Sequence, residues 1–166
     1  MTAPVIPKNA IELVKKFEGL KLTSYLCPSN KWTIGYGHTF GVVEGQTITK
    51  EQADIFLQED LYDAMNGALR YCPILADYPE KLGAIISFVF NLGTQRLRES
   101  TLRKRINEQN WEEAAKEIKK WVYAGKVILP GLIKRRIAES KYLADYKKTD
   151  QIIEELKDSK EEIKNK

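Results

Sequence analysis

Residues 17–38 read FEGLKLTSYLCPSNKWTIGYGH, and this stretch marks a change from helical to extended chain. Gly19 predicts the end of the preceding helix, because glycine most readily adopts the left-handed conformation that follows many helices. From residue 20 to about residue 48 the chain is rich in Gly, Thr, Tyr and β-branched residues, with turn signals at residues 28–30 and 43–45. This pattern predicts a small antiparallel sheet of two or three strands.

Helices are predicted on both sides of this sheet. Asn9 with Glu12 has the spacing of an N-cap and its partner for the first helix, and Thr49 with Gln52 repeats the signal after the sheet. Apolar residues at helical spacing extend this second helix to about residue 71, which is long enough to connect two lobes. The rest of the chain is predicted to be helical throughout, with helices at about residues 79–92, 99–107, 111–121 and 132–146.

The C-terminal residues 147–166 have a different composition. Six lysines balance six acidic residues there, and the apolar stripe is thin. We expect a charged helical tail that is solvated and appended to a finished domain. Docking of this tail onto a partner or onto the domain itself is the alternative.

The overall composition is that of an ordinary globular domain. The 166 residues are 43% hydrophobic and 30% charged, and the formal net charge is +4, which suits an anionic polymer such as a bacterial wall or a nucleic acid. Two cysteines and one histidine argue against a disulfide scaffold and a zinc site, and no metal or cofactor is expected. No apolar run has the length of a membrane span, and no signal peptide is recognised, so we expect a protein made in a cytoplasm.

Three residues in the quoted stretch carry candidate chemistry. Glu18 lies in the last turn of the first helix, where the helix dipole and partial burial favour a protonated carboxyl, so it is a candidate general acid. The hydroxyl of Thr33 can hold one water in a fixed orientation. The thiol of Cys27 can act as a base or nucleophile if a nearby cation lowers its pKa. Hydrolysis of a glycosidic bond requires little more than a proton donor on one side of the bond and a group that holds a water on the other.

Each of these residues also has a purely structural interpretation. Glu18 can be a surface residue at a helix end, Thr33 a β-former in a strand, and Cys27 a small buried apolar residue. His38, the sole histidine, is interpreted as structural, with Asp60 on the long helix as its expected partner. A papain-like pair of Cys27 with His38 is an alternative, although no usual flanking signature accompanies it.

The stretch resembles the phage-type lysozymes, or endolysins, whose catalytic pattern is Glu, then Asp or Cys, then Thr. Glu18, Cys27 and Thr33 have this spacing, with eight and then five residues between them. Further motifs match in the same order over about residues 8–146, at residues 33–39, 87–93, 100–102 and 131–136. The resemblance implies a lysozyme-like α+β fold with a small N-terminal lobe that holds a short antiparallel sheet, a long connecting helix and a mostly helical C-terminal lobe. These three parts are expected at about residues 1–48, 49–71 and 72–146.

The resemblance also implies a function and substrate contacts. It implies a muramidase that hydrolyses the β-1,4 bond between N-acetylmuramic acid and N-acetylglucosamine in bacterial peptidoglycan and so lyses the host cell. Phe90 and Asn91 fall where relatives line the cleft, and a substrate contact is carried over to them and to Tyr36. Arg135 or Arg136 is expected to approach the catalytic acid or the substrate, and a charged pair on a solvated helix face is the alternative.

The cysteine in the middle of the pattern places one role in question, because a neutral thiol stabilises a developing cation less than a carboxylate does. We expect an inverting reaction in which Glu18 protonates the leaving oxygen while a water held by Thr33 and Cys27 attacks from the opposite face. Ionisation of Cys27 near the substrate, a transient nucleophilic role for it, and a larger share for Thr33 and the water are the alternatives.

Some relatives carry an N-terminal signal-anchor and control the site cysteine by disulfide exchange. No such segment is expected here, and Cys72 lies beyond the long helix, so both thiols are expected to be free. We expect a monomer without stable membrane insertion that stays in the host cytoplasm until a holin-like permeabilising protein releases it. It then acts on the cell wall from the periplasm.

Three other functions remain open at this level. A wall-binding module would keep the cleft without turnover, and a lytic transglycosylase would cleave the same bond but leave an anhydro sugar. Non-specific nucleic-acid binding is the third, but no recognised nucleic-acid motif accompanies the basic residues. Those residues are Arg96, Arg98, Arg103, Lys104, Arg105, Lys134, Arg135 and Arg136.

Overall fold

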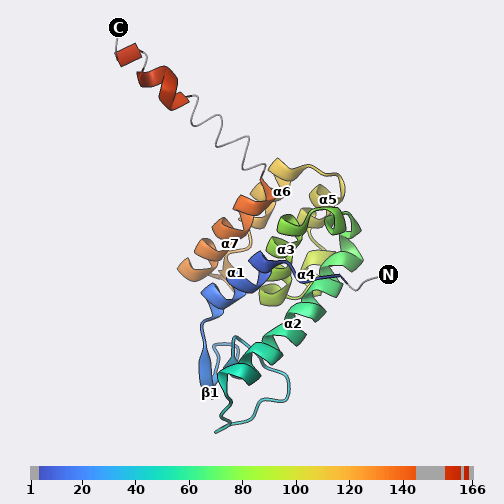
Figure 1. Ribbon diagram of the computed structural model, residues 1–166, viewed down its shortest axis with the longest axis vertical. Coiled ribbons are helices and arrows are strands. Elements are labelled where there is room, and N and C mark those ends of the chain that lie inside the picture. Colours follow the sequence, from blue (N-terminus) through green and yellow to red (C-terminus); the bar gives the residue numbers. More distant parts are fainter. Residues whose placement is uncertain (1–3, 145–155, 162, 165–166) are drawn as a thin grey trace.

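The computed structural model describes residues 4–144, 156–161 and 163–164, and its class is α+β, as the sequence predicts (Figure 1). Residues 156–161 and 163–164 are helical and exposed. The choice between a solvated and a docked tail over residues 147–166 depends largely on residues outside this described part.

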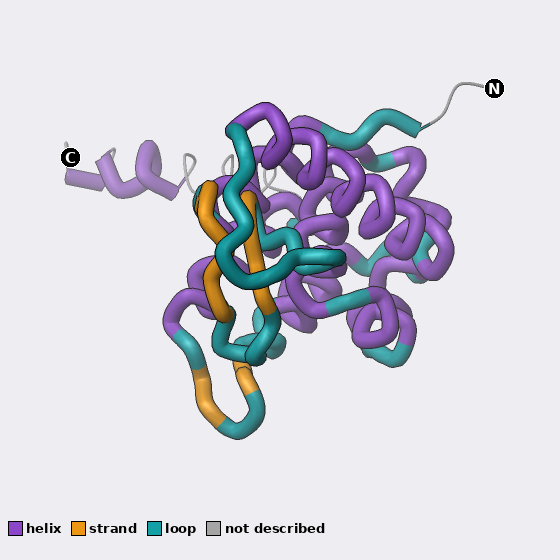
Figure 2. Tube along the Cα trace, turned by 90° about the horizontal axis from the view of Figure 1, so that it is seen from below, coloured by secondary structure: helices purple, strands orange, loops and turns teal. Residues whose placement is uncertain are grey.

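The N-terminal part of the chain consists of one helix and one β-hairpin. Helix α1 (Lys8–Glu18) ends at Gly19, whose φ of +68° favours glycine. Strands β1 (Lys21–Leu26) and β2 (Trp32–Gly35) pair antiparallel across the turn at residues 28–30, with a bulge in the register. The predicted small sheet is therefore this two-stranded hairpin, and Figure 2 shows its strands at one side of the helices.

Helix α2 (Lys50–Tyr71) connects the hairpin to the helical lobe, as predicted. Its N-terminus is a capping box: Thr49 Oγ1 accepts from the Gln52 backbone N–H at 3.2 Å, and Gln52 Oε1 accepts from the Thr49 N–H at 3.0 Å. Its apolar residues recur at helical spacing and are buried, at Ala53, Leu57, Leu61, Ala64, Met65 and Ala68.

Short helices build the C-terminal lobe around α3. They are the 3₁₀ helix η1 (Pro73–Asp77), α3 (Pro79–Leu92), α4 (Thr94–Arg98), α5 (Thr101–Asn107), α6 (Trp111–Ile118) and α7 (Pro130–Leu143). The region predicted as one helix from residue 99 begins only at Thr101, because the Ser100 hydroxyl caps α5 by accepting from the Arg103 backbone N–H at 3.0 Å. α3 is buried over most of its length, with Phe88 in the core, and packs against α1, α2 and α7.

The segment between α6 and α7 is not helical, so the expectation of helix throughout this half of the chain is wrong. Tyr123–Ala124 (β3) and Val127–Ile128 (β4) form a second hairpin. Gly125 has a φ of +62° in its turn, and the flanking Tyr, Val and Ile residues favour extended backbone. Two strands of two residues each are too short to leave a clear alternating pattern in the sequence.

The predicted N-cap at Asn9 is also wrong. α1 begins at Lys8 with Pro7 as its N-cap, two residues earlier than predicted, and Asn9 is buried where α1 crosses α3. Its amide donates to the Glu80 backbone carbonyl at 2.7 Å, and a Cβ at Gly83 would lie 1.9 Å from its Oδ1. Asn9 therefore serves a close helix–helix contact instead of the helix end. Among the described residues, no helix combines the length and the apolar character needed to cross a membrane.

Candidate active site

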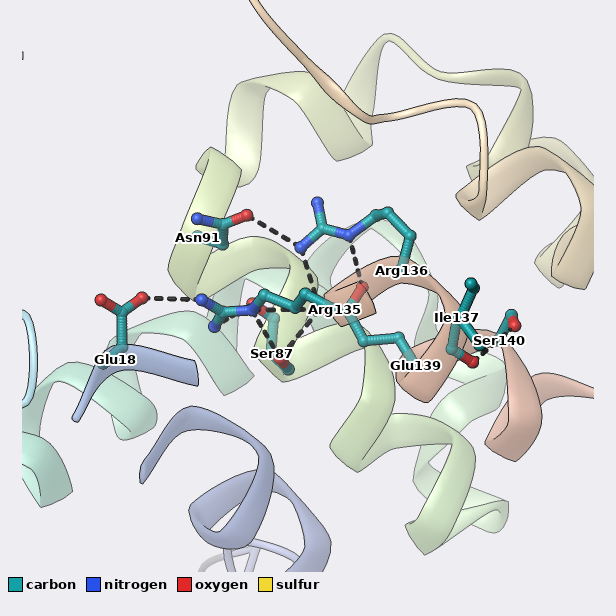
Figure 3. Close-up of polar contacts among 8 residues, drawn as sticks. All are labelled: Glu18, Ser87, Asn91, Arg135, Arg136, Ile137, Glu139 and Ser140. Atoms are coloured by element: carbon teal, nitrogen blue, oxygen red, sulfur yellow. Dashed lines mark hydrogen bonds and ion pairs between the residues drawn. The ribbon is translucent and has the colours of Figure 1, made fainter. Parts of the chain in front are cut away.

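Glu18 is the last residue of α1, and its side chain points toward α7 (Figure 3). The side chain is 22% exposed, so the partial burial expected from the sequence is present. Gly37, in the loop after β2, passes close to it: a Cβ at this position would lie 2.8 Å from Glu18 Oε2. This loop can approach the carboxyl because Gly37 has no side chain and adopts a φ of +75°.

Arg135 on α7 contacts Glu18 directly. Its Nη1 donates to Glu18 Oε1 at 2.7 Å, and the Arg135 side chain is only 4% exposed. The guanidinium also lies 5.8 Å from the centroid of the Phe17 ring. The sequence left open which of two arginines approaches Glu18, and it did not anticipate that a buried cation would engage only one oxygen of the carboxyl.

Arg136 has a different environment, and the expectation that it contacts substrate is wrong. Its side chain is fully buried, and its Nη2 donates to Asn91 Oδ1 at 2.8 Å and to Glu139 Oε1 at 3.0 Å. Successive residues of a helix point in directions about 100° apart, so Arg135 reaches α1 while Arg136 enters the helical lobe. The alternative of a charged pair on a solvated helix face is excluded by the same burial.

Thr33 lies on β2 and is 3% exposed. Its hydroxyl donates to the Lys31 carbonyl at 3.0 Å, so its oxygen remains free to accept a hydrogen bond from water. Its cross-strand partner is Tyr25, a residue that the sequence analysis missed. Burial raises the pKa of Tyr25, and the charges of Glu18 and Cys27 raise it further, so both groups act on this one ring.

Cys27 follows β1 and is partly exposed. Its Sγ lies 3.0 Å from Ser29 Oγ, and this hydrogen bond is the main reason that the pKa of the thiol falls to about 7. Burial opposes the shift, while the backbone of Lys31 and of Ser29 adds to it. From the sequence, Cys27 was a candidate base or nucleophile on the condition that a nearby cation lowered its pKa; here the Ser29 hydroxyl and backbone donors lower it instead.

The three residues predicted to contact substrate differ in accessibility. Phe90 and Asn91 are half-buried at the end of α3, and the amide NH₂ of Asn91 is not used by its contact with Arg136. Tyr36 is only 7% exposed, and Lys15 Nζ lies 5.1 Å from its ring centroid. Tyr36 therefore packs in the core and offers little surface to a sugar, in contrast to the expectation.

His38 lies in the loop after β2 and contacts α2 in the manner expected for a structural residue. Its Nδ1 is 2.7 Å from Asp60 Oδ2, and its ring stacks on Phe56 with centroids 4.3 Å apart. Burial raises the pKa of Asp60, while the hydrogen bond to His38 opposes the shift. Because the His38 backbone also bridges to Ile34, the pair ties the loop that carries Gly37 to the long helix.

Both cysteines are free thiols, as expected. Cys72 is buried at the end of α2, and burial raises its pKa to about 12. The Cys72 thiol is therefore much less reactive than the Cys27 thiol.

Comparisons with known proteins agree with this arrangement. Residues 15–139 match the family model "Phage lysozyme". The chain belongs to the phage lysozyme family. Membership makes it a glycoside hydrolase of the lysozyme class.

The individual relatives are endolysins and a muramidase domain. The endolysin of Acyrthosiphon pisum secondary endosymbiont phage 1 is 41% identical over 139 residues, which cover 81% of this chain and 94% of that one. The endolysin of Bacillus phage B103 is 35% identical over 137 residues, and the match spans only 52% of that longer protein. Among solved structures, the muramidase domain of SpmX from Asticaccaulis excentricus has a TM-score of 0.76 at 31% identity, covering 86% of this chain and 99% of that one. The lysozyme-like fold is thereby confirmed.

Proposed function

We propose that this chain is an endolysin that hydrolyses the β-1,4 bond between N-acetylmuramic acid and N-acetylglucosamine in bacterial peptidoglycan. The observation that carries the proposal is that the Glu18 carboxyl lies against Gly37, directly after the hairpin that carries the buried Thr33 and leads into Cys27, whose thiol has a pKa of about 7. Family membership supplies the reaction class.

Glu18 is the general acid in this proposal. Arg135 engages Oε1, so a proton on Oε2 can point away from the ion pair toward the leaving glycosidic oxygen. A protonated carboxyl still accepts from Arg135 through its carbonyl oxygen, and the contact therefore orients the acid in either protonation state. Partial burial strengthens this orientation because little water competes for the carboxyl.

Water is activated on the opposite side of the bond. Thr33 accepts one hydrogen bond from the water, since its own hydroxyl proton is donated to the Lys31 carbonyl. The Cys27 thiolate takes the proton that the water loses as its oxygen bonds to the anomeric carbon. The C–O bond to the leaving sugar breaks at the same time, and that oxygen receives the proton of Glu18. Solvent then returns the proton from Cys27 to Glu18, and the product has inverted configuration.

The free NH₂ of Asn91 is the proposed donor to a substrate oxygen, with Phe90 as its apolar neighbour. The positive net charge favours association with an anionic cell envelope. We further propose that the enzyme acts as a monomer and reaches the cell wall through a separate holin-like permeabilising protein. Its site before release is the host cytoplasm.

Product analysis tests the proposal. Purified peptidoglycan is digested with the wild-type protein and with Glu18→Gln, and the fragments are examined by mass spectrometry. We expect reducing-end fragments from the wild type and none from the variant. Fragments lighter by one water would instead identify a lytic transglycosylase, and binding without any fragments would identify a wall-binding module.

A further inference from the structure

A dry cluster of charges lies behind Glu18, and the reaction steps above use only its outermost member. Arg136 and Glu139 on α7 have fully buried side chains, Arg135 is 4% exposed, and Ser87 on α3 is fully buried (Figure 3). Charges that lose their water are stable only if they are paired within the protein. The two arginines need two carboxylates, and Glu18 supplies only one of them.

Glu139 is the second carboxylate, and it serves both arginines. Its Oε1 accepts from Arg136 Nη2 at 3.0 Å and from the Ser87 hydroxyl at 2.8 Å, and it lies 3.4 Å from Arg135 Nε. Its Oε2 lies 2.9 Å from Arg136 Nε. These contacts follow from position, because residues three and four apart on a helix share a face.

Glu139 lies close to Nε of both arginines and also accepts from Nη2 of Arg136, whereas Nη1 of Arg135 makes no contact with it. Arg135 is also fixed by Ser87, whose hydroxyl accepts from Nε at 3.3 Å and whose carbonyl accepts from Nη2 at 3.2 Å. Its Nη1 is then aimed at Glu18, whereas Nη2 of Arg136 is aimed at Asn91. The buried carboxylate of Glu139 is therefore connected to the catalytic acid through Arg135 and to the proposed sugar contact through Arg136.

We propose that Glu139 is a positioning residue of this active site: it clamps Arg135 against Glu18 and Arg136 against Asn91, and its negative charge offsets the second of the two cations. The inference rests on the proposed function for its catalytic meaning. Burial raises the pKa of Glu139, and the two guanidiniums act in the opposite direction.

The charge has a consequence that can be measured. Without it, the guanidinium of Arg135 would lose part of its counter-charge and would act more strongly on Glu18, which favours the ionised carboxyl. The groups that face Glu139 are Arg135 and Arg136 from its own helix and Ser87 from α3. The groups that face Glu18 are Arg135 from α7 and Tyr25 from β1.

The experiment uses the full chain and three variants. Glu139→Gln removes the charge at nearly constant shape, and Glu139→Asp keeps the charge on a shorter side chain. Ser87→Ala removes the two hydrogen bonds of the Ser87 hydroxyl in the same cluster without changing any charge. Circular dichroism establishes that each is folded. The titration of Glu18 is followed by carboxyl ¹³C NMR, assigned with Glu18→Gln, and kcat and KM are measured against pH on soluble peptidoglycan fragments.

For Glu139→Gln we expect the Glu18 titration and the alkaline limb of kcat/KM to move to lower pH by about one unit, as a newly unbalanced neighbouring charge would cause. We expect KM to rise roughly fivefold from a loosened Asn91, about the net effect of one hydrogen bond. Glu139→Asp should raise KM but leave the limb in place, and Ser87→Ala, which removes no charge, should also leave the limb in place.

An unmoved titration in Glu139→Gln, or an equal shift in Ser87→Ala, would overturn the inference. If Glu139→Gln does not fold, Glu139→Asp decides: an unchanged KM overturns the clamp, and a raised KM with an unmoved limb supports it. The NMR titration needs no turnover, so a wild type without hydrolytic activity would refute the proposed function and leave this measurement valid.

Discussion

Gly37 lies so close to Glu18 that a Cβ added to the glycine would come within 2.8 Å of the Oε2 atom of the glutamate. The proposed general acid is thus enclosed between a backbone without a side chain and the guanidinium of Arg135. His38 and Asp60 hold the loop of Gly37 on α2, which makes this approach a fixed property of the fold.

Gly37→Ala should therefore reduce activity by more than tenfold. The new methyl group displaces the carboxyl, which Arg135 prevents from moving freely, and the φ of +75° adds roughly 1–2 kcal/mol of backbone strain. Gly41→Ala is the matched control, because Gly41 has a φ of +69° and nothing within 4 Å of an added Cβ. The control should lose similar stability in thermal unfolding yet retain activity in a turbidity assay on permeabilised cells. Equal losses of activity would point to strain alone.

Cys27 should impose an acid limb near pH 7 on the rate profile. The thiol pKa lies at about 7, so the thiolate that accepts the proton of water accumulates as the pH rises through this value and is lost below it. Cys27→Asp should move the limb to lower pH, toward the carboxyl range of about 4, and Cys27→Ser should abolish it along with most activity. A serine variant with full activity would exclude an essential thiolate. Cys72 provides an internal comparison, since iodoacetamide at pH 7 should alkylate Cys27 alone.

Ser29→Ala should shift the acid limb of the rate profile to higher pH. The Ser29 hydroxyl is the largest contributor to the lowered pKa of Cys27, and its loss should return the thiol toward the ordinary value of about 8.5. Activity at pH 7 should then fall several-fold while activity at pH 9 remains close to the wild type. A pH profile of kcat/KM measures the shift, and an unchanged limb would show that another group is the base.

Gly83→Ala should destabilise the protein by about 3 kcal/mol, the upper range for overpacking a core. Its Cβ would lie 1.9 Å from Asn9 Oδ1 at the crossing of α1 and α3. Adding Asn9→Ala should recover part of this loss by removing the obstructing amide. Gly131→Ala in α7 has open space around its Cβ and should leave the free energy of unfolding nearly unchanged. Urea unfolding of the four proteins, followed by circular dichroism, compares these values.

Local signals in the sequence were sufficient for most of the fold. The Thr49–Gln52 capping box and the apolar spacing that follows it determine α2, because a helix start and its buried face depend on residues within a few turns. The end of α1 at Gly19 is predictable for the same reason. The β3–β4 hairpin was not, since two-residue strands are stabilised mainly by their surroundings.

In the candidate site, too, some residues were recognisable from local sequence and others depended on tertiary packing. Glu18, Cys27 and Thr33 stand at a spacing that the sequence alone makes recognisable, and it also shows Gly19 and Gly37, which adopt a positive φ in the structure. Asn9 was misassigned, because its amide can cap a helix or bridge two helices and only the helix crossing selects between them.

By itself, the sequence determined the elements, their order and the chemical identity of the proposed acid, thiol and hydroxyl. Tertiary structure decided which arginine meets Glu18, that Arg136 and Tyr36 are buried, and that Glu139 stands behind both arginines. The physical reason is that helix propensity and capping act between near neighbours in the chain. A partly buried ion pair between Glu18 and Arg135 exists only after α1, α3 and α7 have packed together.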